Sequence, residues 1–153
     1  MEEVQKSVRA AAPAVAMITA GSVEYHKQAH AAVAAARTAV PQAVIVMGGI
    51  YPTVLPEEVG RDSNVDWLFL YHVEERIASF LELVLAGEDA KLRQFPGIAF
   101  RDGDGRVIDT KLTEHIGNVK VMVKPDYSLL DVRPYLDQNS LDYQFNSSRP
   151  RRS

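Results

Sequence analysis

Histidines are the side chains best suited to bind a metal or transfer a proton in this chain, which contains four of them and no cysteine. His26 and His30 occupy positions i and i+4 of a predicted helix and share one face, a spacing that binds zinc in some hydrolases. Lys27 stands where those enzymes carry a glutamate general base, and the sequence offers no third ligand. The pattern therefore favours a polar helix face, and we assign neither a metal ligand nor a catalytic residue.

His72 follows an apolar run over 65–71, at the end of a predicted strand where open α/β sheets bind ligands. The alternative is a solvated loop histidine that contacts no ligand. Glu74 and Glu75 could act as acid–base carboxylates, but they also fall in the first turn of a helix predicted over 74–86, where the helix dipole favours negative charge. We favour this second interpretation of the two acids.

The stretch 43–53, AVIVMGGIYPT, runs from a buried strand into two glycines. Gly48 and Gly49 lack Cβ, so the backbone can adopt positive φ there and a flat ligand can lie against it. Pro52 is expected to hold Tyr51 in an extended conformation and to stiffen the loop. Such a loop at the carboxyl end of a parallel strand is typical of a ligand site, and a tight turn without a ligand is the alternative.

Hydrophobic periodicity divides the chain into alternating helices and strands, which is typical of a doubly wound parallel sheet. The expected fold class is α/β, a Rossmann-like or flavodoxin-like parallel sheet with flanking helices, a β-hairpin appendage and an extended C-terminal linker. The predicted elements are helices over 2–12, 23–40, 57–60 and 74–86, strands over 14–18, 43–47 and 65–71, hairpin strands over 97–101 and 106–109, and a further strand over 119–123.

Three loops, over 20–22, 48–53 and 71–74, follow the predicted parallel strands and should meet at one edge of the sheet. They offer small residues and backbone amides but few titratable groups, which suits a large planar or nucleotide-like ligand better than proton transfer. Ser22 has no histidine and acid in catalytic order. Neither a P-loop nor a G-x-G-x-x-G motif is present to explain the glycines.

Composition sets further bounds on the class of protein. The chain has 153 residues, 46% of them hydrophobic, and a net charge of -3, which suits one globular domain and disfavours nucleic-acid or anionic-membrane partners. Without cysteine it can form neither a disulfide nor an iron–sulfur cluster. No apolar run approaches the roughly 20 residues of a membrane span, so we expect a cytoplasmic protein.

At the same loops the chain resembles the cobalamin-binding domain of radical S-adenosylmethionine enzymes, through Pro13–Ser22, VIVMGGIYPTVLPEEV (44–59), NVDWLFLYHVEER (64–76) and PGIAFRDGDGRV (96–107). The resemblance implies a cobalamin-binding module over 1–123 that lacks the family's first strands, so that its sheet is incomplete. It further implies a linker over 124–153 towards a radical S-adenosylmethionine barrel, the domain that would hold the cluster and S-adenosylmethionine, and it leaves open whether this chain is part of an enzyme. The residues that the resemblance implies as cobalamin contacts are Ser22, Gly48, Gly49, Tyr51, Pro52, Thr53, His72 and Glu74.

The alternative is a non-enzymatic scaffold with a flavodoxin-like sheet that forms a homodimer through an open sheet edge. A flavin or nucleotide-sugar ligand at the same loops is a third, weaker hypothesis.

Overall fold

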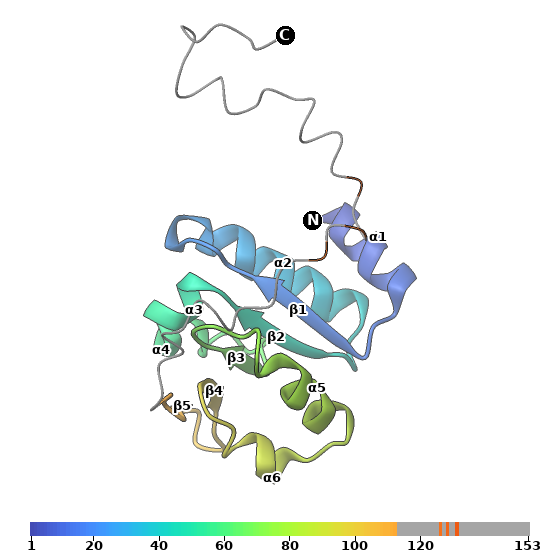
Figure 1. Ribbon diagram of the computed structural model, residues 1–153. Coiled ribbons are helices and arrows are strands. Elements are labelled where there is room, and N and C mark those ends of the chain that lie inside the picture. Colours follow the sequence, from blue (N-terminus) through green and yellow to red (C-terminus); the bar gives the residue numbers. More distant parts are fainter. Residues whose placement is uncertain (113–125, 127, 129–130, 132–153) are drawn as a thin grey trace, which may run out of the picture. The chain divides into compact units, whose positions relative to one another are not determined.

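A computed structural model describes residues 1–112 together with residues 126, 128 and 131 (Figure 1). The chain divides into two compact units, Met1–Lys120 and Val121–Ser153, and every helix and strand given below belongs to the first. The strand predicted over 119–123, and all but three residues of the linker predicted over 124–153, lie outside the described residues.

The centre of the first unit is an open five-stranded sheet in which the strands lie in sequence order. The first three strands are parallel, and β4 and β5 each run antiparallel to the strand before. The architecture is therefore α/β, as predicted. The strands are β1 (Val15–Thr19), β2 (Val44–Gly48), β3 (Trp67–Phe69), β4 (Ile98–Arg101) and β5 (Val107–Asp109).

The predicted hairpin forms at one edge of the sheet, where β4 pairs antiparallel with β3. Ile98, Ala99 and Phe100 are all buried, so β4 is apolar on both faces and fits between two other strands. Phe100 pairs with Trp67 of β3, with ring centroids 5.3 Å apart. The carboxylate of Asp102 accepts the backbone N–H groups of residues 104 and 106 and so closes the turn.

Helices cover both faces of the sheet, and alternate residues of β2 contact different layers. Ile45 and Met47 belong to the apolar cluster beneath α2, α3 and α4, whereas Val46 packs in the cluster with α5 and α6. Figure 1 shows α1 and α2 on one side of the strands and α5 and α6 on the other. The helices are α1 (Glu2–Ala11), η1 (Val23–Tyr25), α2 (His26–Ala39), α3 (Ile50–Val54), α4 (Pro56–Val59), α5 (Ile77–Leu85) and α6 (Asp89–Leu92).

Two predictions about local structure near the glycine loop are wrong. Residues 50–54 form α3, with Pro52 inside it, where we expected an extended loop. Proline is tolerated because the first N–H groups of a helix have no acceptor within that helix. The helix predicted over 74–86 begins only at Ile77, so Glu74 and Glu75 precede it and lie outside its first turn, where they were expected.

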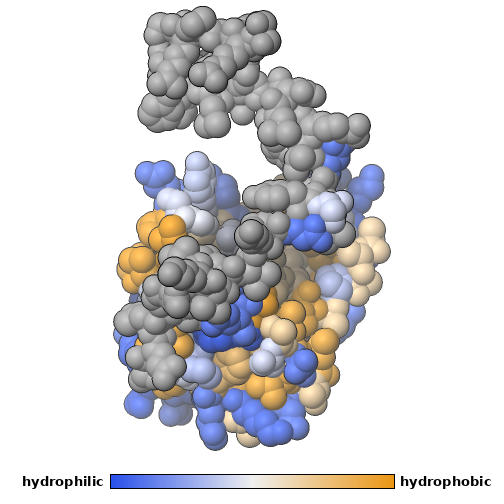
Figure 2. Space-filling model, viewed as in Figure 1, coloured by the Kyte–Doolittle hydropathy of each residue, from blue (hydrophilic) through white to orange (hydrophobic). Residues whose placement is uncertain are grey.

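One long edge of the sheet has no strand beside it among the described residues, because β1 pairs only with β2. Met17, in the middle of β1, is 42% exposed. Figure 2 shows hydrophobic residues on the viewed face where Figure 1 draws β1 and α5. In the described part of the chain, no helix combines the length and apolar character needed to cross a membrane.

Candidate functional site

A pocket of about 430 Å³ opens at the carboxyl ends of β2 and β3, the edge of the sheet that the sequence indicates. Its walls come from α3, from the loop after β3 and from the segment after β5. Ile50 and Val54 of α3 are 58% and 59% exposed, unusually high values for large aliphatic side chains. The lining residues are Gly49, Ile50, Thr53, Val54, Tyr71, His72 and Leu112.

Gly49 connects β2 to α3 with a backbone conformation that L side chains rarely adopt, at φ 107° and ψ −166°. A Cβ at this position would lie 2.5 Å from the carbonyl oxygen of Ala20. That close approach is fixed by two hydrogen bonds, from Ala20 N to Gly48 O (2.8 Å) and from Tyr51 N to Ala20 O (3.1 Å). The glycine is therefore required to join the loops after β1 and β2, whether or not a ligand is bound.

Thr53 links α3 to the loop after β3. Its hydroxyl donates to Gly49 O at 2.8 Å and accepts the N–H of Tyr71 at 3.0 Å. Tyr71 has φ 61°, a left-handed conformation that is uncommon for any residue other than glycine. The Thr53 bond thus holds Tyr71 and the neighbouring His72 against the pocket.

Arg76 fixes the same loop from the side of β4. Its guanidinium donates to the carbonyl oxygens of Leu70 (2.8 Å), His72 (2.6 Å) and Pro96, and it stacks over the Phe69 ring at 4.8 Å. Burial lowers the pKa of Arg76, and the negative charge of nearby Glu74 offsets part of that effect. Nε of Arg76 is buried without a hydrogen-bond partner among the described residues, so the side chain satisfies backbone acceptors at some cost to its own solvation.

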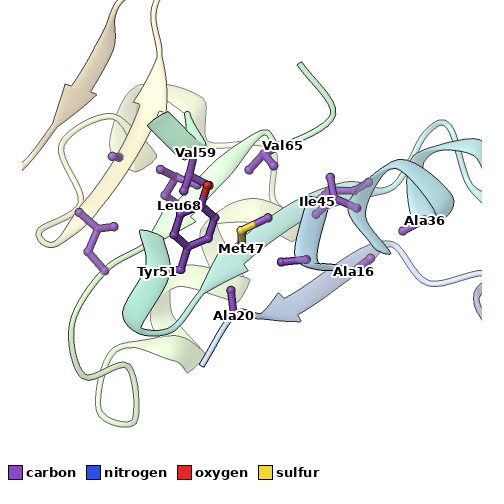
Figure 3. Packing of buried hydrophobic residues seen from close by; sticks show 13 residues of the cluster. Ala16, Ala20, Ala36, Ile45, Met47, Tyr51, Val59, Val65 and Leu68 are labelled. Atoms are coloured by element: carbon purple, nitrogen blue, oxygen red, sulfur yellow. The ribbon is translucent and has the colours of Figure 1, made fainter. Parts of the chain in front are cut away.

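Tyr51 points away from the pocket into the core, where it is fully buried. Figure 3 shows its ring near Met47 of β2, with the hydroxyl oxygen on the side of Val59. The hydroxyl donates to Glu58 at 2.9 Å and lies 3.1 Å from Nε2 of His30. Burial is the main cause that raises the pKa of Tyr51 to about 12, and the hydrogen bond to Glu58 adds to it.

Three of the residues predicted to contact a ligand line the pocket together, namely Gly49, Thr53 and His72. His72 is exposed at the pocket, and its side chain has no hydrogen-bond partner in the described part of the chain. Gly48 is half-buried at the end of β2, where a Cβ would touch Phe69 O at 3.4 Å.

The remaining predicted contacts lie outside the pocket walls. Tyr51 and Pro52 are buried on the core side of α3. The Oγ of Ser22 accepts the N–H of Glu24 at 3.3 Å and caps η1. Glu74 is exposed beyond the pocket.

Sequence analysis included Ile50 and Tyr71 in the predicted ligand loops but not among the contacts, and it missed Val54, Leu112 and Arg76. The i, i+4 spacing of Ile50 and Val54 was the available signal, but it is visible only if residues 50–54 are read as a helix. The bond from Arg76 to Pro96 O joins segments about twenty residues apart, and no local pattern predicts it.

Among the residues that the structure describes, the titratable side chains lining the pocket are His72 and Tyr71, and none is a carboxylate. Such a lining suits ligand binding better than proton transfer. In residues 1–112 and the three isolated described positions, no group of three or more His, Cys, Asp or Glu side chains is arranged to hold a metal ion. Asp66 accepts the N–H of Ile45 at 2.7 Å and pairs with Arg37 at 2.6 Å.

Comparison with known proteins adds no relative to this picture. The sequence matches no protein-family model, and a search of curated proteins finds no significant match.

Proposed function

We propose that this chain is a cobalamin-binding module with a Rossmann-like sheet, in which the carboxyl ends of the parallel strands contact one face of the corrin. The observation that carries the proposal is the largely apolar pocket after β2 and β3, because it combines exposed aliphatic side chains, a glycine and an imidazole. The resemblance of the same loops to cobalamin-binding domains supports it.

The residues present fit a corrin ring in their chemistry. Ile50 and Val54 offer an apolar wall, and the imidazole of His72 is exposed beside it. Gly49 adds no side chain to the floor of the pocket, and the hydrogen bonds described above hold Gly49 and Thr53 in place. When bound, cobalamin supplies alkyl-transfer chemistry at its cobalt, while the residues of this chain bind and orient it. A radical S-adenosylmethionine barrel would be the partner that uses the exposed face.

The test is to mix the purified chain with hydroxocobalamin, desalt it and record the absorbance. We expect retained colour for the unchanged chain and its loss for Val54→Asp, because a carboxylate on the apolar wall must be desolvated on binding. Leu85→Asp is a matched control, since Leu85 is 66% exposed on α5, outside the pocket. The proposal fails if the folded chain retains no cobalamin, or if both variants retain it equally.

A second candidate function, homodimerisation as a scaffold, is favoured by the outer edge of β1, which has no strand beside it within the described residues. Ala14 O accepts Val44 N and Ala20 N donates to Gly48 O, so even-numbered residues of this segment bond to β2. The N–H and C=O groups of Val15, Met17 and Thr19 therefore point away from β2, and β1 carries no charge or proline to prevent pairing.

Sedimentation without cobalamin tests this function, and Met17→Lys is the informative variant. If the edge pairs, the unchanged chain sediments as a dimer and the variant as a monomer. Monomers in both samples would rule it out.

A further inference from the structure

The hydroxyl of Tyr51 lies where three helices meet beneath the pocket. It connects His30 of α2, at 3.1 Å, with Glu58 of α4, at 2.9 Å. The other ring nitrogen of His30, Nδ1, is 2.6 Å from Oδ2 of Asp62. The His30 and Tyr51 rings also meet edge to face, with centroids 5.7 Å apart. The binding proposal above uses none of these polar contacts.

With Glu58 and Asp62 both present as carboxylates, one charge state satisfies all three contacts. The hydroxyl of Tyr51 has a single proton, which it donates to Glu58. Nε2 of His30 must then carry a proton of its own to donate to the Tyr51 oxygen. Nδ1 faces a carboxylate oxygen and needs a proton as well, unless that carboxyl is itself protonated. With Asp62 ionised, the arrangement requires the imidazolium form of His30.

The surroundings keep Asp62 ionised and Tyr51 protonated. Burial alone would raise the pKa of Asp62, but hydrogen bonds lower it, and those from Asn64 act in that direction whatever the charge of His30. Asn64 donates both its backbone N–H and its side-chain amide to Oδ1, each at 2.9 Å. The pKa of Tyr51 is raised to about 12, so its hydroxyl keeps the proton that Glu58 accepts.

We propose that His30, Tyr51, Glu58 and Asp62 form a proton-dependent clamp on α3, complete only while His30 carries both ring protons. When His30 loses one proton, its remaining N–H stays with Asp62, and Nε2 competes with Glu58 for the single proton of Tyr51. Either the contact from α2 to α3 or the contact from α3 to α4 is then lost.

The clamp bears on the pocket because α3 contributes to both. Tyr51 lies on the core side of α3, while Ile50, Thr53 and Val54 line the pocket from the opposite side of this helix. Proton loss from His30 therefore loosens one wall of the pocket. The clamp itself does not depend on which ligand binds, but its effect on cobalamin affinity rests on the function proposed above.

One other titratable group lies beside the clamp. His26, one turn earlier on α2, has its ring centroid 6.1 Å from that of Tyr51, and its Nδ1 is 2.9 Å from Val23 O. It makes no contact with Glu58 or Asp62 among the hydrogen bonds of the described residues. His26→Gln is therefore a matched control for His30→Gln.

The first experiment is side-chain nitrogen NMR on the ligand-free chain across the range where histidines titrate, about pH 5 to 8. We expect both ring nitrogens of His30 to be protonated at the acidic end, and the Tyr51 resonances to shift in the same step as His30 loses a proton. A single protonated nitrogen at the acidic end, or a Tyr51 signal that ignores this step, would overturn the clamp.

Thermal unfolding over the same pH range provides the second readout. The melting temperature should fall as His30 loses its proton, in the unchanged chain and in His26→Gln, and this step should be missing in His30→Gln. A step that survives in a folded His30→Gln chain would contradict the proposal. Titration with hydroxocobalamin at both ends of the range then tests the effect on the pocket: weaker binding at high pH is expected, whereas no binding at either pH counts against the proposed function and leaves the NMR result standing.

Discussion

Replacing Gly49 by alanine tests whether the glycine loop is required by the fold itself. The new Cβ would lie 2.5 Å from the carbonyl oxygen of Ala20 and 2.9 Å from its carbonyl carbon, so backbone must move. Ala20 is held by its bonds to Gly48 and Tyr51, and moving it weakens both. The unusual φ of 107° adds strain for any residue with a side chain.

The expected loss follows from these contributions. Backbone strain costs about 1–3 kcal/mol, and the two weakened hydrogen bonds cost about 0.5–1.5 kcal/mol each. We therefore expect Gly49→Ala to lower the free energy of unfolding by roughly 2–6 kcal/mol, the sum of those ranges. That is a large part of the total for a domain of this size.

Urea unfolding measures the loss, followed by the fluorescence of Trp67, which is the single tryptophan of the chain and only 8% exposed. Gly21→Ala is the control, since a Cβ there meets nothing within 4 Å and its φ is not positive. We expect this control to change stability by no more than about 1 kcal/mol. Equal stability of the two variants would refute the structural role assigned to Gly49.

Three further predictions concern contacts away from that loop. Arg76→Met keeps the aliphatic packing on Phe69 but removes the donors to three carbonyls. Urea unfolding should show a loss of about 1–3 kcal/mol in the free energy of unfolding. An unchanged midpoint would count against the role of Arg76 in holding the loop after β3. The pKa of Asp62 is lower in the folded state, so its stabilisation is present above the unfolded value of about 3.9 and is lost as pH falls through the folded value. Asp62→Asn should therefore flatten this part of an acid-unfolding curve, and an unchanged curve would be inconsistent with the lowered pKa. Phe80 is fully buried against Phe69, with ring centroids 4.9 Å apart. Phe80→Ala should lower the free energy of unfolding by about 3–5 kcal/mol, as measured by the same denaturation.

Local patterns were sufficient to predict most elements of the fold. The alternating and continuous apolar runs gave the positions of β1, β2 and β3 to within a few residues, and the Asp-Gly turn gave the β4–β5 hairpin. The pairing of this hairpin with β3 was not predicted, because strand pairing is a long-range property. Whether β4 pairs with β3 depends on which apolar face is left uncovered, which the hairpin's own residues do not specify.

The sequence indicated where the candidate site lies in the fold, but not the residues that form its apolar wall. The carboxyl ends of parallel strands meet at one edge by geometry, so the loops after β2 and β3 could be brought together from the sequence. Pro52 suggested an extended loop, because its effect on the preceding residue usually dominates. Packing of Tyr51 beneath α3 outweighs that preference and leaves Ile50 and Val54 on the open side.

The sequence by itself determined the α/β class, the order of the parallel strands along the chain and the sheet edge at which the pocket opens, because these depend on residue periodicity and on the short turns between elements. Only the tertiary structure decided the contact of Gly49 with Ala20, the three carbonyls held by Arg76 and the pairing of His30 with Asp62. The Gly49–Ala20 and His30–Asp62 contacts and the bond from Arg76 to Pro96 O join segments some twenty to thirty residues apart, and such contacts form only when the whole sheet and its helices have packed. Their energies depend on burial and on matched donors and acceptors, which no single stretch of sequence contains.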